Sequence, residues 1–152
     1  MTRMIRMFSL AFLAVTMAAP SGHAADSNRA AVDFKTPSDI KWVRNAAGTN
    51  EQSVLFGDPS KLGPYVVRIK WLPGNMSQSH FHPNDRFFVV VSGTWWMRTG
   101  ETFDPENTGP APAGSYVIHY AGKVHYDGAK DEETIIQVWG MGPATSTPAG
   151  KR

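Results

Sequence analysis

Short apolar runs, each closed by a turn, follow one another along the chain from about residue 40. They are rich in β-branched and aromatic residues, which is typical of strands, and Gly or Pro separates them. The expected strands are 40–43, 53–56, 65–72, 86–92, 94–98, 115–120 and 134–139. Residues 101–113 contain several Gly and Pro residues and predict a loop. No stretch after residue 25 has a helical period, so the pattern predicts a single all-β domain, an antiparallel sandwich or small barrel.

The first 25 residues have a different pattern. A basic start with Arg3 and Arg6 precedes an apolar run from Met7 to Ala19, and small residues surround Ala24. This is the layout of a secretory signal peptide, and the run is shorter than the ~20 residues needed to span a bilayer. We therefore predict a signal peptide over 1–25, a barrel domain over 38–143 and a flexible tail over 144–152. The mature protein is then expected in the periplasm or outside the cell.

Charge and cysteine content narrow the classes of function. The chain has 15 Lys and Arg against 13 Asp and Glu, a net charge of +2. Cleavage of the leader would remove Arg3 and Arg6 and leave equal numbers of both signs. No basic stripe remains to neutralise a row of phosphates, which excludes nucleic-acid binding. Because the chain has no cysteine, packing rather than disulfides must hold an exported domain together.

Two histidines, His80 and His82, stand two positions apart in a further segment that we expect to be extended like a strand. Residues two apart in a strand project to the same face, so both imidazoles could contact one ion. A third histidine, His125, follows a turn at Gly122. A His-x-His pair alone occurs often by chance, so its weight depends on the residues around it.

The surrounding residues supply two spaced motifs. Gly74, His80, His82, Arg86 and Gly93 resemble the first motif of the cupin superfamily, in which an acid usually takes the position of Arg86. The chain from about Lys41 to Gly142 is similar to single-domain bacterial cupins.

Gly114, Gly122 and His125 resemble the second cupin motif. Tyr120 replaces its usual proline and Ala129 its usual asparagine. Two motifs in order are specific for the fold and much less specific for activity.

The resemblance implies a small jelly-roll β-barrel with one divalent transition metal (Fe, Mn or Zn) in its mouth. The ligands by position are His80, His82 and His125. Three neutral imidazoles would leave coordination positions open for water or a substrate, as in catalytic rather than structural sites.

Arg86 leaves three arrangements open. A guanidinium has no lone pair to donate, so it cannot be a ligand. It could turn outward and pair with Asp85 or another acid, or point into the barrel and hold the carboxylate of an anionic substrate. Alternatively, Asp85 could supply the missing carboxylate. Alternation from His82 favours position 86 for the inward slot.

Two further residues are candidates for the site beside Arg86. Gln137 stands in an apolar strand where its amide needs a partner, which could be a ligand or the backbone. Tyr120 could donate a phenolic hydrogen bond at the mouth. If Tyr120 points inward, its neighbour His119 points to the opposite face and is not a ligand.

The adjacent Trp95 and Trp96 predict a homodimer. Neighbouring strand residues point to opposite faces, so one of these indoles should meet another subunit.

Three functions remain open. The first is a mononuclear metal enzyme of the dioxygenase type, or an isomerase or decarboxylase, acting on a small organic anion held by Arg86. The second is a module that binds a small ligand or a metal without turnover. The third is a purely structural dimeric β-protein in which the histidines are idle.

Overall fold

The computed structural model describes residues 31–149, and those from Lys35 onward form one compact β unit. Its elements are η1 (Pro37–Asp39), β1 (Val43–Arg44), β2 (Asn50–Phe56), β3 (Gly63–Trp71), β4 (His80–Phe81), β5 (Arg86–Ser92), β6 (Thr94–Thr99), η2 (Pro105–Asn107), β7 (Gly109–Pro112), β8 (Tyr116–His119), β9 (His125–Gly128), β10 (Thr134–Gly142) and β11 (Thr147–Pro148). The predicted signal peptide lies outside the described residues. Within them, no helix is long and apolar enough to span a membrane.

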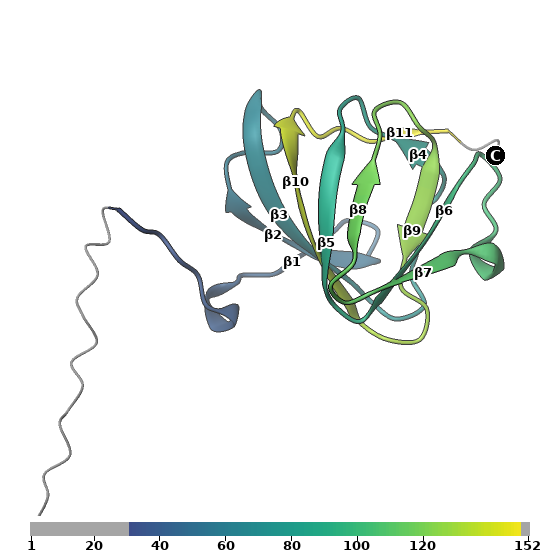
Figure 1. Ribbon diagram of the computed structural model, residues 1–152, viewed down its shortest axis with the longest axis horizontal. Coiled ribbons are helices and arrows are strands. Elements are labelled where there is room, and N and C mark those ends of the chain that lie inside the picture. Colours follow the sequence, from purple (N-terminus) through teal and green to yellow (C-terminus); the bar gives the residue numbers. More distant parts are fainter. Residues whose placement is uncertain (1–30, 150–152) are drawn as a thin grey trace, which may run out of the picture. The chain divides into compact units, whose positions relative to one another are not determined.

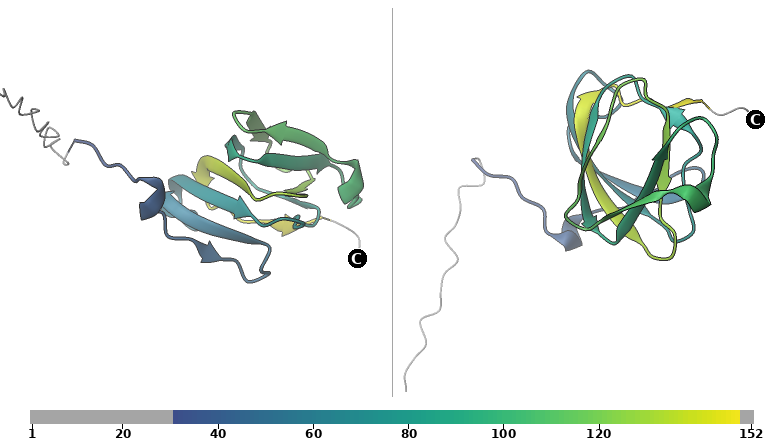
Figure 2. Two further views of the ribbon diagram at one scale, coloured as in Figure 1. Left: turned by 90° about the horizontal axis from the view of Figure 1, so that it is seen from below. Right: turned by 45° about the vertical axis from the view of Figure 1, so that its right-hand side comes forward.

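The strands form two antiparallel sheets that enclose a common interior (Figures 1 and 2). The six-stranded sheet has the order β1-β2-β3-β10-β5-β8, and the five-stranded sheet has the order β11-β4-β9-β6-β7. The predicted all-β jelly-roll fold is confirmed. One expectation was wrong: the loop over 101–113 contains β7, which tolerates Pro110 and Pro112 because it lies at a sheet edge.

The inner face of the six-stranded sheet carries the core. Val67, Val138, Phe88 and Val117 lie directly opposite one another across β3, β10, β5 and β8, and we call them the apolar row. Val138 and Phe88 are fully buried. Burial of each such side chain contributes roughly 1.5–3 kcal/mol.

Trp95 and Trp96 point to opposite faces of β6, as expected. Trp95 is buried, its ring centroid lies 4.8 Å from that of Phe88, and its Nε1 donates to Asp127 Oδ1. Trp96 lies under the ammonium of Lys130, whose Nζ is 4.4 Å from the ring centroid. The outer indole therefore has a neighbour within its own chain, and the homodimer stays a prediction.

Residues 144–149, which belong to the predicted flexible tail, make defined contacts with the barrel. Ala144 packs against the core, β11 pairs with β4, and the Ala149 amide donates to the Ser79 carbonyl. The polar composition suggested fraying, but the exposed edge of β4 provides backbone partners that local sequence does not reveal.

Candidate metal centre

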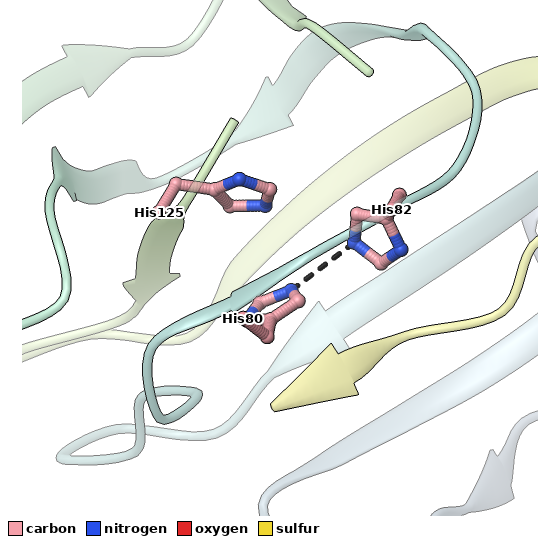
Figure 3. A group of neighbouring side chains, drawn as sticks. All are labelled: His80, His82 and His125. Atoms are coloured by element: carbon pink, nitrogen blue, oxygen red, sulfur yellow. Dashed lines mark hydrogen bonds between the residues drawn. The ribbon is translucent and has the colours of Figure 1, made fainter. Parts of the chain in front are cut away.

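His80, His82 and His125 come together inside the barrel (Figure 3). His80 and His125 are directly paired across β4 and β9, and His82 follows β4 by one residue. The ring centroids are 4.5 Å apart for His80 and His125, 4.8 Å for His80 and His82, and 5.4 Å for His82 and His125. One possible ligand atom from each residue lies within 4.8 Å of the others, so the group is positioned to bind a metal ion.

Each of the three rings is oriented by a backbone carbonyl. The Nδ1 atoms lie 2.8, 2.8 and 2.9 Å from the carbonyl oxygens of Gln78, Thr145 and Lys123, in the order His80, His82, His125. A carbonyl oxygen only accepts, so each Nδ1 carries the hydrogen. In the neutral ring the lone pair is then on Nε2. Such second-shell bonds typically orient metal-binding histidines.

The Nε2 atoms fit a shared cation. The Nε2 atoms of His80 and His82 are 3.1 Å apart. Because both rings carry their hydrogen on Nδ1, neither Nε2 can donate to the other, so this short distance is not explained by a hydrogen bond. Two nitrogens at ~2.1 Å from one ion have about this spacing. His125 Nε2 is buried without a hydrogen-bond partner among the described residues. The donor set therefore suits a divalent transition metal.

Burial favours the neutral, ligand-competent form of these histidines. Desolvation, followed by the charge of Arg86, lowers the pKa of His82 to about 3. Desolvation also lowers the pKa of His125, against the opposing effect of Asp127. Because a protonated imidazole cannot bind a metal, these shifts keep both nitrogens available in mildly acidic solution.

Arg86 points into the barrel and does not turn outward to pair with Asp85. Its Nη1 donates to His82 Nε2 at 2.6 Å, and its buried Nε has no partner among the described residues. No carboxylate in residues 31–149 forms a salt bridge with it. Asp85 instead accepts the Ala121 amide hydrogen at 2.7 Å. An ion can reach the His82 lone pair only after Arg86 releases it.

The assignment of His119 and Tyr120 to faces was wrong. His119 is buried in the interior, and its ring centroid lies 3.9 Å from that of His125, whereas Tyr120 is 60% exposed. The reason is the register, since His119 lies directly opposite the inward Arg86, and Tyr120 follows the end of β8. Tyr120 therefore lies outside the site, and His119 lies inside it.

Gln137 is not in the site either. Its neighbours Ile136 and Val138 point into the core, so alternation turns Gln137 to the outer face of β10. There its Oε1 accepts a hydrogen bond from Arg68 Nε at 3.1 Å.

Asp127 is a functional candidate that sequence reasoning missed. It is buried, and its Oδ2 lies 4.0 Å from His125 Nε2. With His119 and His125 it forms a second group of potential ligands. The available signal was alternation, because position 127 shares a strand face with position 125.

These side chains border a cavity of about 650 Å³. Its described lining includes His80, His82, Arg86, His119 and Asp127 on the polar side. Apolar wall is supplied by Val67, Ile69, Phe88 and Ile136. The cavity is of the size that small-molecule sites have.

Residues 30–145 match the ChrR cupin-like domain family, which is more than half of the chain. The chain belongs to this family. The resemblance to cupins is thereby confirmed, although position 86 has an arginine where the first cupin motif usually has an acid. No curated protein sequence matches the chain.

Solved structures show the same fold. The chain is similar to the polyketide cyclase RemF from Streptomyces resistomycificus, with a TM-score of 0.64 and 14% identity over 80% of this chain and 87% of that one. It is also similar to an uncharacterised double-stranded β-helix protein from Klebsiella pneumoniae, with a TM-score of 0.55 and 27% identity over 72% and 91%. An RmlC-like cupin from Shewanella frigidimarina has a TM-score of 0.57 and 15% identity over 73% and 90%.

Proposed function

We propose that this chain is an exported cupin that binds one divalent transition metal and acts on a small organic anion, with chemistry of the mononuclear dioxygenase type. The observation that carries the proposal is the common orientation of His80, His82 and His125. Each Nδ1 is held by a carbonyl oxygen, which leaves Nε2 as the ligand atom. Export rests on the leader pattern of residues 1–25.

The protein residues would divide the work as follows. The three Nε2 atoms would hold Fe, Mn or Zn, which supplies Lewis acidity and open coordination positions. Arg86 would give up its hydrogen bond to His82 and donate to the substrate anion instead, because its planar guanidinium matches the two oxygens of a carboxylate. Asp127 is the one carboxylate among the described lining residues, so its Oδ2 is the atom to accept or hold a proton.

A non-catalytic small-ligand-binding or metal-binding module is the second candidate, and one contact favours it. Arg86 Nη1 donates to the lone pair of His82 that a metal would need. Most members of the superfamily have an acid, not an arginine, at the position of Arg86. In a metal-free barrel of this kind, Arg86 itself would be the cation that attracts the ligand.

Elemental analysis of the mature protein from metal-replete cells tests the proposal. We expect about one equivalent of a transition metal per chain, and its loss in His80→Ala. An oxygen-consumption screen against pools of small organic acids then separates the candidates. Wild-type protein without metal would overturn the metal centre, and metal-loaded protein stabilised by an acid without turnover would support the binding module.

A further inference from the structure

A second row of side chains crosses the inner face of the six-stranded sheet beside the apolar row. Tyr65 lies opposite Gly140, Gly140 opposite Arg86, and Arg86 opposite His119. We call these four residues the polar row. They come from β3, β10, β5 and β8, so the register alone brings them together.

The polar row contains buried polar atoms that no protein group satisfies. Tyr65 Oη, Arg86 Nε and His119 Nδ1 have no hydrogen-bond partner among the described residues. Tyr65 is 2% exposed and His119 is 8% exposed. All three residues line the cavity that His80 and His82 also line. A buried polar group without a partner is costly, and several around one cavity indicate a ligand that satisfies them.

Gly140 explains how Tyr65 approaches Arg86. Tyr65 and Arg86 are two strands apart, roughly 10 Å between backbones. Gly140 lies between them and has no side chain. The Tyr65 hydroxyl leans into that gap, 3.2 Å from the position of a Cβ at residue 140. The phenol therefore reaches across β10 toward the strand that carries Arg86.

We infer that Tyr65 and Arg86 form a carboxylate-recognition site beside the three histidines, for an acid with a flat apolar body. The phenolic O–H and the guanidinium N–H groups are donors, and a carboxylate has two oxygens to accept them. The body of the acid would lie against Val67 and Phe88, the adjacent members of the apolar row that line the cavity. This inference rests on the proposed function, in which Arg86 holds the substrate anion. It adds Tyr65 as a specificity-determining residue and Gly140 as the gap that it needs.

The test uses zinc-loaded full-length protein, since zinc has no redox chemistry, and benzoate as the probe. Titration calorimetry compares benzoate with benzamide, a neutral molecule of the same shape. We expect benzoate to bind at least about tenfold more tightly than benzamide. Tyr65→Phe should lose about tenfold in benzoate affinity, as a hydrogen bond to a charged group predicts. Arg86→Gln should abolish the preference for benzoate.

Tyr120→Phe is the matched control, because it removes an exposed phenol outside the cavity and should bind benzoate like the wild type. Gly140→Ala is a second variant. Its Cβ would lie 3.2 Å from the Tyr65 hydroxyl and 3.0 Å from the Asp85 carbonyl oxygen. It should therefore displace the phenol or the start of β5 and weaken benzoate binding while Tyr65 is retained.

Zinc content measured on every variant separates this inference from the proposal beneath it. If zinc binds but benzoate has no advantage over benzamide, or Tyr65→Phe binds benzoate like the wild type, the carboxylate site is wrong and the metal centre stands. If the wild type binds no zinc, the metal centre fails, and the inference fails with it.

Discussion

The polar row and the apolar row lie side by side on the same face of the same four strands, yet their side chains are in opposite states. In the apolar row, Val138 and Phe88 are fully buried against other side chains. In the polar row, one position is a glycine and each of the other three residues has a buried polar atom without a partner. Two residues along each strand thus separate packed apolar side chains from polar side chains without partners, and Val67 and Phe88 of the apolar row also border the cavity. The residues that stabilise this barrel therefore lie next to the residues of the candidate site, and substitutions can test the two sets separately.

The largest expected effect breaks the site without breaking the core. His125→Ala should reduce zinc affinity by more than the 10–100-fold that second-shell changes cost, since it removes a ligand itself. Competition with a chromophoric chelator measures the affinity. Gln137→Ala, on the outer face of the same barrel, should bind zinc like the wild type. Equal affinity in His125→Ala and wild type would mean that the three rings do not share an ion.

The converse change removes a core side chain and leaves the three histidines unchanged. Phe88→Ala should lower the free energy of unfolding by about 3–5 kcal/mol, because it leaves a cavity in the apolar row. Urea denaturation measures this loss, and the folded fraction should still bind one zinc. The neighbouring Val89→Ala, which faces outward, should cost far less. Similar losses for both variants would contradict the assignment of the two faces.

Arg86 is a polar-row residue that opposes metal binding. Arg86→Gln should raise zinc affinity about tenfold, since it removes a cation that takes the lone pair of His82. A unit charge at ~4 Å costs on the order of 1–4 kcal/mol, depending on the effective dielectric. Arg86→Lys keeps the charge and should show no such gain. A fall in affinity for Arg86→Gln would show that Arg86 supports the centre.

A further expected effect concerns the pH dependence of the stability of the metal-free protein. Burial lowers the pKa of His82 to about 3 and that of His119 to about 2, from an ordinary 6.5. Between these values the unfolded chain binds more protons than the folded one, so stability falls as the pH falls. Thermal unfolding after chelation should show a Tm lower by on the order of 10 °C at pH 5 than at pH 7.5. A flat profile would mean that these rings are solvated.

The sequence predicted the fold and the three histidines but not all of their neighbours. The cupin spacing of glycines and histidines indicated both motifs, and alternation from His82 placed Arg86 inward. The same rule failed at β8, because the assignment started from Tyr120, which follows the end of the strand. Gln137 was a candidate because an amide in an apolar run needs a partner. That partner is Arg68, from a strand 69 residues away.

The sequence by itself thus predicted the local features of the chain: strands from β-branched runs, turns from Gly and Pro, and candidate metal ligands from the order and spacing of the histidines. Strand pairing decided the rest. Register places Tyr65, Gly140, Arg86 and His119 in one line, and only pairing between distant strands sets a register. The pairing of β11 with β4 likewise orders residues whose composition predicts a loose end. The sequence shows which hydrogen bonds a side chain can make. The neighbour across the sheet determines whether a protein group satisfies them or whether they remain free for a ligand.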